Sequence, residues 1–448
     1  MKLSAIFVPL FLTLPLTARS SFLPTRDSTT APPPYGHNLR QYFYFADNYT
    51  QFNHGAYGGT PIPVLQQQFT YMVKMEQDID PWMNSPFGYH QCIVNARTNL
   101  SALINAPNMN DTVLVDHATE AINSVIRNLE PPLSADEYIF DLSTAYGPFI
   151  GLYQWIQARY GTQTITANIV FPLTGPESFL VPVQQTLAMN ASSINIRVAV
   201  ISHISAYPAA ILPVKELVEL FHSYNIPVIV DGAHALGNIK IDIQNMGNPE
   251  YYFTNIHKWL YGPKSACILY VRSDRQLPHV PAPACIDSIE TDVFSNRYIW
   301  TGTRDRSSYC AINDALLFRQ FLGGEEMIMN YTQSLALQAG HFMAQNFSTY
   351  LLTPDNMTSS MFDIVIPTDN TTACGIVNGQ LRSQYGISVS GNGVLDATHG
   401  NVACYWRLSG QVYLELSDFQ RLATLTVQLL QQLGAHKIPT NKPVHIHT

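Results

Sequence analysis

Short apolar runs recur along the chain, and stretches with helical spacing lie between several of them. The runs occupy residues 111–116, 137–142, 197–204, 226–231, 251–256 and 265–272. The segments that begin at residues 117 and 214 carry apolar residues three and four positions apart, which is typical of amphipathic helices. Strands that are apolar throughout are buried on both faces. The pattern therefore predicts an α/β fold, with a mostly parallel sheet covered by helices on both sides.

The pattern changes after about residue 305. A helix is expected over residues 313–324, strands over 361–367 and 402–410, and a last helix over 417–434. This order predicts a smaller α+β C-terminal domain over residues 306–440, which follows a large domain over residues 41–305. Residues 21–40 are rich in proline, serine and threonine, which is typical of a flexible leader.

The first twenty residues have the features of a signal peptide. Lys2 precedes an apolar run that ends near Leu16, and small residues follow at Ala18 and Ser20. A buried N-terminal helix is the alternative. Glycosylation triplets support entry into the secretory pathway. They begin at Asn48, Asn99, Asn110, Asn190, Asn330, Asn346, Asn356 and Asn370. Whether the protein stays in the endomembrane system or leaves the cell is left open by the sequence. No later segment has the length and apolarity of a membrane span.

Composition narrows the function. Apolar residues make up 46% of the 448 residues and charged residues only 12%, so a large core is available. The net charge of −8 and the lack of a basic stripe argue against nucleic-acid binding. The six cysteines have no CxxC spacing, which excludes a zinc site of that kind and a disulfide scaffold. We therefore expect no bound metal, and one or two disulfides remain open.

Candidate chemistry follows the ends of the predicted strands, where ligands bind in open α/β sheets. Each polar residue there also has an ordinary explanation. Asp231 could end a strand in a turn, Thr119 could cap a helix, and Lys258 could extend its ammonium to the surface. The full set of residues at these strand ends is Thr119, Tyr146, His203, Ser205, Asp231, His234, His257 and Lys258.

Together these residue types meet the needs of pyridoxal phosphate. An amine forms a Schiff base with the aldehyde, a carboxylate keeps the pyridine nitrogen protonated, and an aromatic ring stacks on the cofactor. A helix N-terminus receives the phosphate. Lys258 lies in the apolar stretch 251–264, where desolvation would favour the neutral, nucleophilic amine. The sequence therefore predicts a pyridoxal-phosphate site built around Lys258 and Asp231.

The segments DGAHALG (231–237) and FTNIHKWLYGPKSACILYVR (253–272) resemble fold-type I pyridoxal-phosphate enzymes of the class V aminotransferase family. That family includes cysteine desulfurases and isopenicillin N epimerase-like proteins. Four shorter segments, 52–61, 116–127, 300–305 and 406–413, are similar to family segments that occur in the same order. The resemblance covers most of the chain from about residue 50.

The resemblance implies a role for each site residue. Lys258 would carry the cofactor and act as acid and base, Asp231 would pair with the pyridinium, and His234 would lie beside it. Arg407 would grip the substrate's α-carboxylate. Thr303 would reach the phosphate of a partner subunit, which implies a homodimer. The remaining roles are ring stacking for Tyr146, phosphate binding for Thr119 and His257, ring-oxygen contact for Ser205 and His203, and the substrate side for Asn53 and His54.

The reaction is expected to act on an amino acid with a β-leaving group. The resemblance extends to fungal secondary-metabolism enzymes, including the cysteine desulfurase-like enzyme of the ustiloxin peptide pathway. It implies Cβ–S cleavage, or β-decarboxylation with carbon–carbon bond formation, for which an aldehyde-bearing peptide intermediate is a candidate second substrate. A persulfide-forming desulfurase needs a mobile cysteine, and Cys404 is nearest by position. An epimerase, an aminotransferase and a catalytically silent secreted binding protein remain alternatives.

Overall fold

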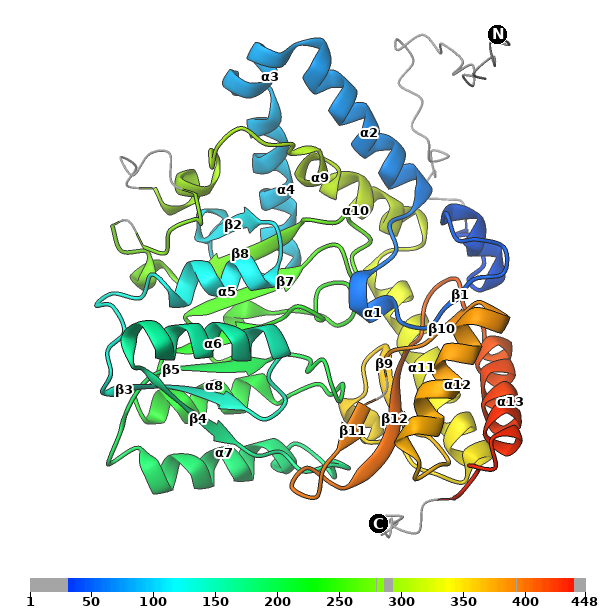
Figure 1. Ribbon diagram of the computed structural model, residues 1–448. Coiled ribbons are helices and arrows are strands. Elements are labelled where there is room, and N and C mark those ends of the chain that lie inside the picture. The colour runs from blue at the N-terminus through cyan, green and yellow to red at the C-terminus, as the bar shows by residue number, and fades with distance from the viewer. Residues whose placement is uncertain (1–30, 279, 286–292, 392, 439–448) are drawn as a thin grey trace, which may run out of the picture.

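The protein is described by a computed structural model that covers residues 31–278, 280–285, 293–391 and 393–438 (Figure 1). The predicted signal peptide, residues 1–20, lies outside these residues, as does the leader up to residue 30. Among the helices of the described ranges, none has the length and apolarity to cross a membrane.

A seven-stranded sheet forms the centre of the large domain, and its strand order is β2-β8-β7-β6-β5-β3-β4. All neighbouring strands pair in parallel except β8, which is antiparallel to both β7 and β2. The predicted mostly parallel sheet is thus confirmed. Its strands are β2 (Thr112–Val115), β3 (Glu137–Leu142), β4 (Gln163–Ala167), β5 (Asn195–Ser202), β6 (Val228–Asp231), β7 (Tyr251–Asn255) and β8 (Cys267–Val271).

Helices cover both faces of this sheet (Figure 1). Alternate strand residues enter two separate apolar clusters, as the two-residue period of a strand requires. One cluster packs under α5 (Ala118–Ile126) and α6 (Gly147–Tyr160). The other packs under α4 (Tyr89–Leu103), α7 (Glu177–Asn190) and α8 (Val214–Ser223). The continuous apolar runs of the sequence therefore reflect strands that are buried on both sides.

The C-terminal domain has an antiparallel sheet of order β11-β12-β9. These strands are β9 (Met361–Val365), β11 (Gly393–Leu395) and β12 (Val402–Ser409). Helices α11 (Glu325–Phe347), α12 (Thr371–Tyr385) and α13 (Leu416–Gln432) share its apolar core. The second predicted domain therefore has the expected α+β character.

The N-terminal segment packs with this C-terminal domain. Strand β1 (Thr50–Gln51) pairs in parallel with β10 (Ile387–Ser388), which lies far along the chain. Leu39, Phe43 and Phe52 belong to the same apolar cluster as α11 and α13. This differs from the predicted boundary, which placed residues from 41 onward in the large domain. Apolar side chains alone do not reveal which of two cores they join.

The remaining helices include α2, which is long and lies at the top of Figure 1, and several short ones. They are η1 (His37–Tyr42), α1 (His54–Tyr57), α2 (Ile62–Gln77), α3 (Ile79–Asn84), η2 (Met109–Asp111), η3 (Ile243–Asn245), η4 (Ser273–Arg275), η5 (Phe294–Tyr298), α9 (Ser307–Cys310), α10 (Ile312–Phe321) and η6 (Asp355–Met357).

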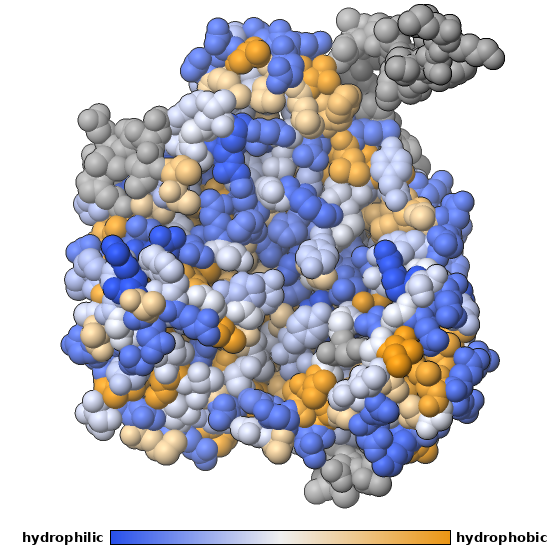
Figure 2. Space-filling view, viewed as in Figure 1, coloured by the Kyte–Doolittle hydropathy of each residue, from blue (hydrophilic) through white to orange (hydrophobic). Residues whose placement is uncertain are grey.

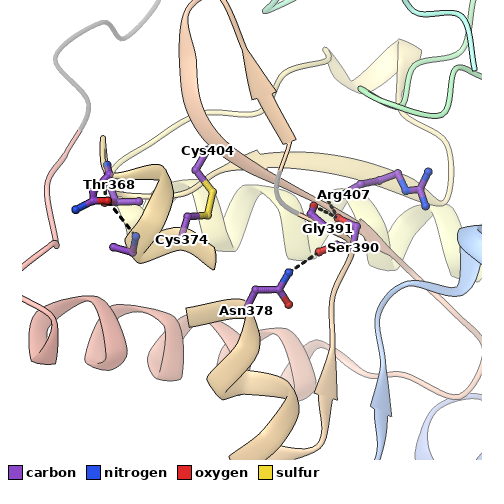
Figure 3. The surroundings of a disulfide bond; sticks show 9 residues. Thr368, Cys374, Asn378, Ser390, Gly391, Cys404 and Arg407 are labelled. Atoms are coloured by element: carbon purple, nitrogen blue, oxygen red, sulfur yellow. Dashed lines mark hydrogen bonds between the residues drawn. A yellow bond between two sulfur atoms is a disulfide. The ribbon is translucent and has the colours of Figure 1, made fainter. Parts of the chain in front are cut away.

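Two disulfides tie distant elements together. Cys92 of α4 is bonded to Cys310 of α9, and Cys374 of α12 is bonded to Cys404 of β12 (Figure 3). The Cα atoms of these pairs are 4.6 and 6.5 Å apart. Both separations lie within the usual range for a disulfide.

Candidate active site

Lys258 lies just beyond the end of β7, and its side chain is buried, with 9% of the residue exposed. Its Nζ lies 3.2 Å from Nε2 of His234, which follows the neighbouring strand β6. The pKa of Lys258 is lowered to about 8, mainly by burial and also by the positive charge of Arg407, while Asp231 opposes the shift. The amine therefore loses its proton far more readily than an exposed lysine. That is the state in which it can attack an aldehyde.

Asp231 is the last residue of β6, held between β5 and β7 by parallel pairing to Ser202 and Phe253. It is 5% exposed, and its Oδ1 accepts a hydrogen bond of 2.9 Å from the backbone amide of Ala233. Burial raises the pKa of this carboxyl to about 6, against that hydrogen bond and the nearby charge of Lys258. A buried carboxylate of this kind favours a cationic partner. A pyridinium nitrogen is such a partner.

The backbone of Lys258 is held by His54. Nε2 of His54 donates to the carbonyl oxygen of Lys258 over 2.9 Å, and Nδ1 accepts from the Tyr413 hydroxyl over 2.9 Å. His54 is fully buried, and burial lowers its pKa to about 3, so the ring is neutral. The prediction that His54 lines the substrate side is therefore not supported. Both nitrogens are used inside the protein, and the residue positions the lysine.

Gly58 shows how closely this segment approaches the lysine. Its φ is +68°, and a Cβ there would collide with the carbonyl of His257. Only glycine adopts this conformation without strain and leaves that space free. The turn after His54 is thus built to lie against the backbone of residues 257 and 258.

The N-terminus of α5 lies beside the lysine segment. The helix is capped by His117, whose Nδ1 accepts from the amide of Glu120 over 3.0 Å, and Thr119 lies in the first turn. The cap is therefore His117, and not Thr119 as the alternative explanation had it. The amide of Ala118 donates to Oδ1 of Asn255 at the end of β7, over 3.0 Å.

His257 belongs to this end of the site. Its Nδ1 donates to the carbonyl of Ala266 over 3.1 Å, and burial together with Lys258 lowers its pKa to about 4. An electrostatic contribution from His117 adds to that shift, which places the two histidines near each other. Helix N-termini bind phosphate through free amides and the helix dipole. The sequence analysis missed Asn255, although a polar residue at the end of an apolar strand was a usable signal.

Tyr146 directly precedes α6 and is 43% exposed. Burial raises the pKa of its hydroxyl, and the charges of Asp231 and Arg407 also act on it. Tyr146 therefore lies near both predicted ends of the site. Its predicted stacking on the cofactor remains a prediction.

Arg407 lies on β12 and is 2% exposed. Its Nη1 donates to the carbonyl of Ala206 over 2.7 Å, and its Nη2 donates to Oδ1 of Asn53 over 3.1 Å. The guanidinium carbon lies 4.1 Å from the ring centroid of Tyr207, a cation–π arrangement. The structure thus brings Arg407 and Asn53 together, and their contacts with a substrate remain predictions.

No acidic side chain within the described ranges is hydrogen-bonded to the Arg407 guanidinium, and its Nε is buried without a partner there. Asp363 faces Arg407 across the β9–β12 ladder, but burial raises the pKa of its carboxyl to about 8. Its Oδ2 accepts from the amide of Ala209 over 2.6 Å. The arginine is therefore positioned by neutral groups, and its charge is available to a bound carboxylate.

Ser205, His203 and Thr303 complete the set of predicted site residues, and only for Ser205 does the structure argue against the predicted role. The hydroxyl of Ser205 is fully buried, donates to the carbonyl of Pro208 over 2.6 Å and accepts from the amide of Ala210. It closes its own loop, so the structure does not support its predicted contact with the cofactor. His203 is buried, and its Nδ1 lies 2.9 Å from the hydroxyl of Tyr252. Thr303 is exposed, and its contact with a partner subunit remains a prediction.

The residues present fit pyridoxal phosphate. A lysine with a lowered pKa, a buried carboxylate and the start of α5 meet at one edge of the sheet. Nδ1 of His234 is buried without a hydrogen-bond partner among the described residues, and its Nε2 lies 3.2 Å from Nζ of Lys258. Burial keeps His234 neutral, since its pKa falls well below the usual value.

Comparison with known proteins gives a consistent result. A model of the family described as Aminotransferase class-V matches residues 60–422. The chain is 28% identical to an L-cysteine desulfhydrase of Arabidopsis thaliana, over 87% of this chain and 90% of that one. It is 25% identical to a hercynylcysteine sulfoxide lyase of Schizosaccharomyces pombe, over 87% and 96%. Among solved structures, it resembles the protein C-DES with glycine covalently linked to its PLP cofactor, with a TM-score of 0.68, 17% identity and coverage of 86% and 98%.

Proposed function

Because the chain belongs to the class V aminotransferase family and has pyridoxal 5′-phosphate as its cofactor, we propose that it is a lyase that breaks the Cβ–S bond of an L-amino acid. One observation carries the proposal: the buried amine of Lys258, with its lowered pKa, lies 3.2 Å from His234 and within the electrostatic influence of both Asp231 and Arg407. An amino acid held by Arg407 would have its Cα near that amine. The names of the two curated relatives support carbon–sulfur cleavage.

The protein's residues divide the work. Arg407 binds the α-carboxylate in a bidentate contact. Asn53 accepts a hydrogen bond from Nη2 of the guanidinium and so holds it in place. Lys258 removes the proton from Cα, and His234 holds its Nζ in place at 3.2 Å. His54 fixes the backbone from which that side chain extends. Pyridoxal phosphate, when bound, supplies the electron sink that makes the Cα proton acidic.

The cysteines favour a lyase that releases sulfur directly over a desulfurase that carries a persulfide. Cys404, the candidate nearest by position, is bonded to Cys374. Cys267 is buried in β8, where burial raises its pKa well above the usual value, so the reactive thiolate is disfavoured. Cys285 is free and exposed. It comes after the end of β8, which pairs with the start of β7, whereas Lys258 comes after the end of β7. The segments that carry Cys285 and Lys258 therefore leave the sheet at opposite ends.

We propose a homodimer with shared active sites. Figure 2 shows apolar side chains gathered over α2 and α3, and Phe69, Ile79 and Phe87 are 65%, 52% and 85% exposed. Exposed apolar patches of this kind mark interaction sites. Thr303 is exposed, as a residue that reaches a partner must be.

We also propose that the protein folds in the secretory pathway. The two disulfides support an oxidising compartment. Seven of the eight asparagines in glycosylation triplets are exposed, and Asn190 is half-buried. Non-reducing mass spectrometry of the secreted or lumenal protein is expected to find two free thiols, at Cys267 and Cys285. Glycosidase treatment is expected to lower its mass. Six free thiols and an unchanged mass would contradict this localisation.

The fungal natural-product role, in a ustiloxin-type pathway, rests on the sequence resemblance described above. It predicts that the preferred substrate is a cysteine derivative or its sulfinate, and that an aldehyde acceptor changes the product.

Product analysis tests the reaction. Purified holoprotein would be incubated in deuterated water with L-cysteine, cysteine sulfinate, aspartate and S-substituted cysteines, with and without an aldehyde. The expected products are pyruvate, ammonia and the released thiol or sulfide. Deuterium at Cα without loss of the β-group would identify an epimerase, and consumption of an added keto acid would identify an aminotransferase. A yellow protein without any turnover would indicate a binding protein.

A further inference from the structure

A cavity of about 430 Å³ opens beside Arg407. Its walls come from both domains: from the loops that follow β3, β4 and β5, and from the segment that carries β11 and the start of β12. The lining residues are Ser143, Thr144, Phe171, Tyr207, Pro208, Gly391, Gly393, Val394, Leu395, His399 and Tyr405.

Three links join this cavity to the candidate active site. Tyr207 lines the cavity and also lies over the guanidinium of Arg407 at 4.1 Å. Tyr405 lies two residues before Arg407 on β12, so both side chains lie on the same face of that strand. Thr144 comes two residues before Tyr146, whose hydroxyl is influenced by both Asp231 and Arg407. The cavity is thus a neighbour of the position where the substrate's carboxylate binds.

The walls of the cavity are held in place. The amide of Phe171 donates to the carbonyl of His399 over 2.9 Å, which ties the loop after β4 to the segment before β12. Gly393 lies against the ring of Tyr405 so closely that a Cβ would overlap it. Asp363 and Arg407 both bond to the loop that carries Tyr207, through Ala209 and Ala206. The space is therefore formed before a ligand arrives.

The lining is aromatic and nearly uncharged. Phe171, Tyr207 and Tyr405 supply rings, Pro208, Val394 and Leu395 supply apolar surface, and none of the lining residues is a lysine, arginine, aspartate or glutamate. Thr144 is 4% exposed, and its hydroxyl has no hydrogen-bond partner in the described part of the chain.

We propose that this cavity, the Tyr207 pocket, holds the group attached to sulfur, so that the substrates are S-conjugated L-cysteines with an uncharged aromatic substituent. This rests on the proposed Cβ–S lyase function. Pockets of this volume hold ligands far larger than a thiol. In the reaction, the Cβ–S bond breaks, sulfur leaves with the bonding electrons and takes up a proton as a thiol. The three-carbon fragment and water give pyruvate and ammonia.

Filling the pocket tests the proposal. Val394 lines the pocket and is 55% exposed, so Val394→Trp adds bulk at its rim without disturbing the core. Ile376→Trp is the matched control, because Ile376 is 44% exposed on α12 and does not line the pocket. The probes are S-benzyl-L-cysteine and L-cysteine, with pyruvate as the product measured.

Wild-type protein is expected to have a kcat/KM at least about tenfold higher for S-benzyl-L-cysteine than for L-cysteine. Val394→Trp should lower the first value about tenfold or more and leave the second within about twofold. Ile376→Trp should change neither. Equal effects of Val394→Trp on both substrates, or no effect on either, would overturn the pocket assignment.

Binding provides a readout that needs no turnover. The carbon analogue of S-benzyl-L-cysteine, with a methylene in place of sulfur, has no leaving group. Calorimetry should show that it binds wild-type holoprotein at least about tenfold tighter than L-alanine, and that Val394→Trp removes this advantage. If neither substrate yields pyruvate but the binding advantage is present, the lyase function is wrong and the pocket stands. Equal affinities for the carbon analogue and for L-alanine would overturn the pocket assignment itself.

Discussion

The lysine end and the arginine end of the site are built in different ways. Asp231 and Lys258 are 5% and 9% exposed and lie at the ends of paired strands of the large sheet. Around Arg407, by contrast, Tyr146 and Tyr207 are 43% and 38% exposed and lie in loops. Groups that carry out the chemistry need a fixed geometry, and paired strands provide it. Arg407 itself is 2% exposed on β12, but the two tyrosines near it lie in loops, where sequence change disturbs the sheet least.

The two ends are nevertheless coupled through charge. Arg407 lowers the pKa of Lys258, and Asp231 raises it. The neutrality of the lysine thus depends in part on a residue of the other domain. Variants at either end can therefore show whether the two regions act separately or as one unit.

Lys258→Ala should have the largest effect, because it removes both the cofactor anchor and the proton carrier. We expect kcat for pyruvate release to fall at least about a thousandfold. The protein should also lose the yellow colour that borohydride bleaches in the wild type. Lys240→Ala, at an exposed lysine of the same domain, is the control. Full activity in the Lys258 variant would refute the mechanism.

Arg407→Lys should weaken substrate binding at the arginine end and leave cofactor binding at the lysine end unchanged. Lysine keeps the charge but lacks the planar fork that matches a carboxylate, so kcat/KM should fall about a hundredfold, mainly through KM. Cofactor content, measured by absorbance, should stay within about twofold of the wild type. Arg382→Lys is a matched control, because Arg382 also stacks on a tyrosine, Tyr49, but lies outside the site. A loss of bound cofactor in Arg407→Lys would show that the division of roles is wrong.

The same contrast explains what the sequence revealed. Lys258 and Asp231 were found because a lysine inside an apolar stretch and an aspartate at the end of a β-branched strand are local patterns. Arg407 and Asn53 depended on the family resemblance, since they are 354 positions apart and meet only in the fold. The eight predicted strands are all present, because a mainly apolar run is also a local pattern.

The misplaced residues were those whose hydrogen-bond partners no sequence pattern identifies. His54 is bonded to Lys258 and Tyr413, and no local pattern distinguishes such a histidine from one that faces a substrate. Ser205 is used by its own turn, which an isolated serine does not reveal. The Tyr207 pocket is formed by three loops of one domain and the segment of the other that carries β11 and the start of β12, so it has no sequence signature.

The pH dependence of cofactor capture tests the coupling between the ends. The pKa of Lys258 is lowered to about 8, so the neutral amine should predominate above that pH and decrease about tenfold per unit below it. The rate at which apoprotein turns yellow with pyridoxal phosphate should follow this profile, after correction with a simple lysine peptide. Arg407→Gln removes a charge that lowers the pKa, so its midpoint should move to higher pH. Asp231→Asn should move it to lower pH. A wild-type midpoint near the ordinary value of 10.5 would contradict the assignment.

The smallest effect is expected from Cys285→Ser. If sulfur leaves directly as a thiol or sulfide, no protein thiolate has to accept it, and the four disulfide-bonded cysteines could not do so. Product release should therefore stay within about twofold of the wild type, with or without an added external thiol, and cofactor absorbance should not change. A desulfurase that stored sulfur on Cys285 would behave differently. It would lose thiol-dependent sulfide release in this variant while keeping its cofactor, and that result would replace the lyase by a persulfide mechanism.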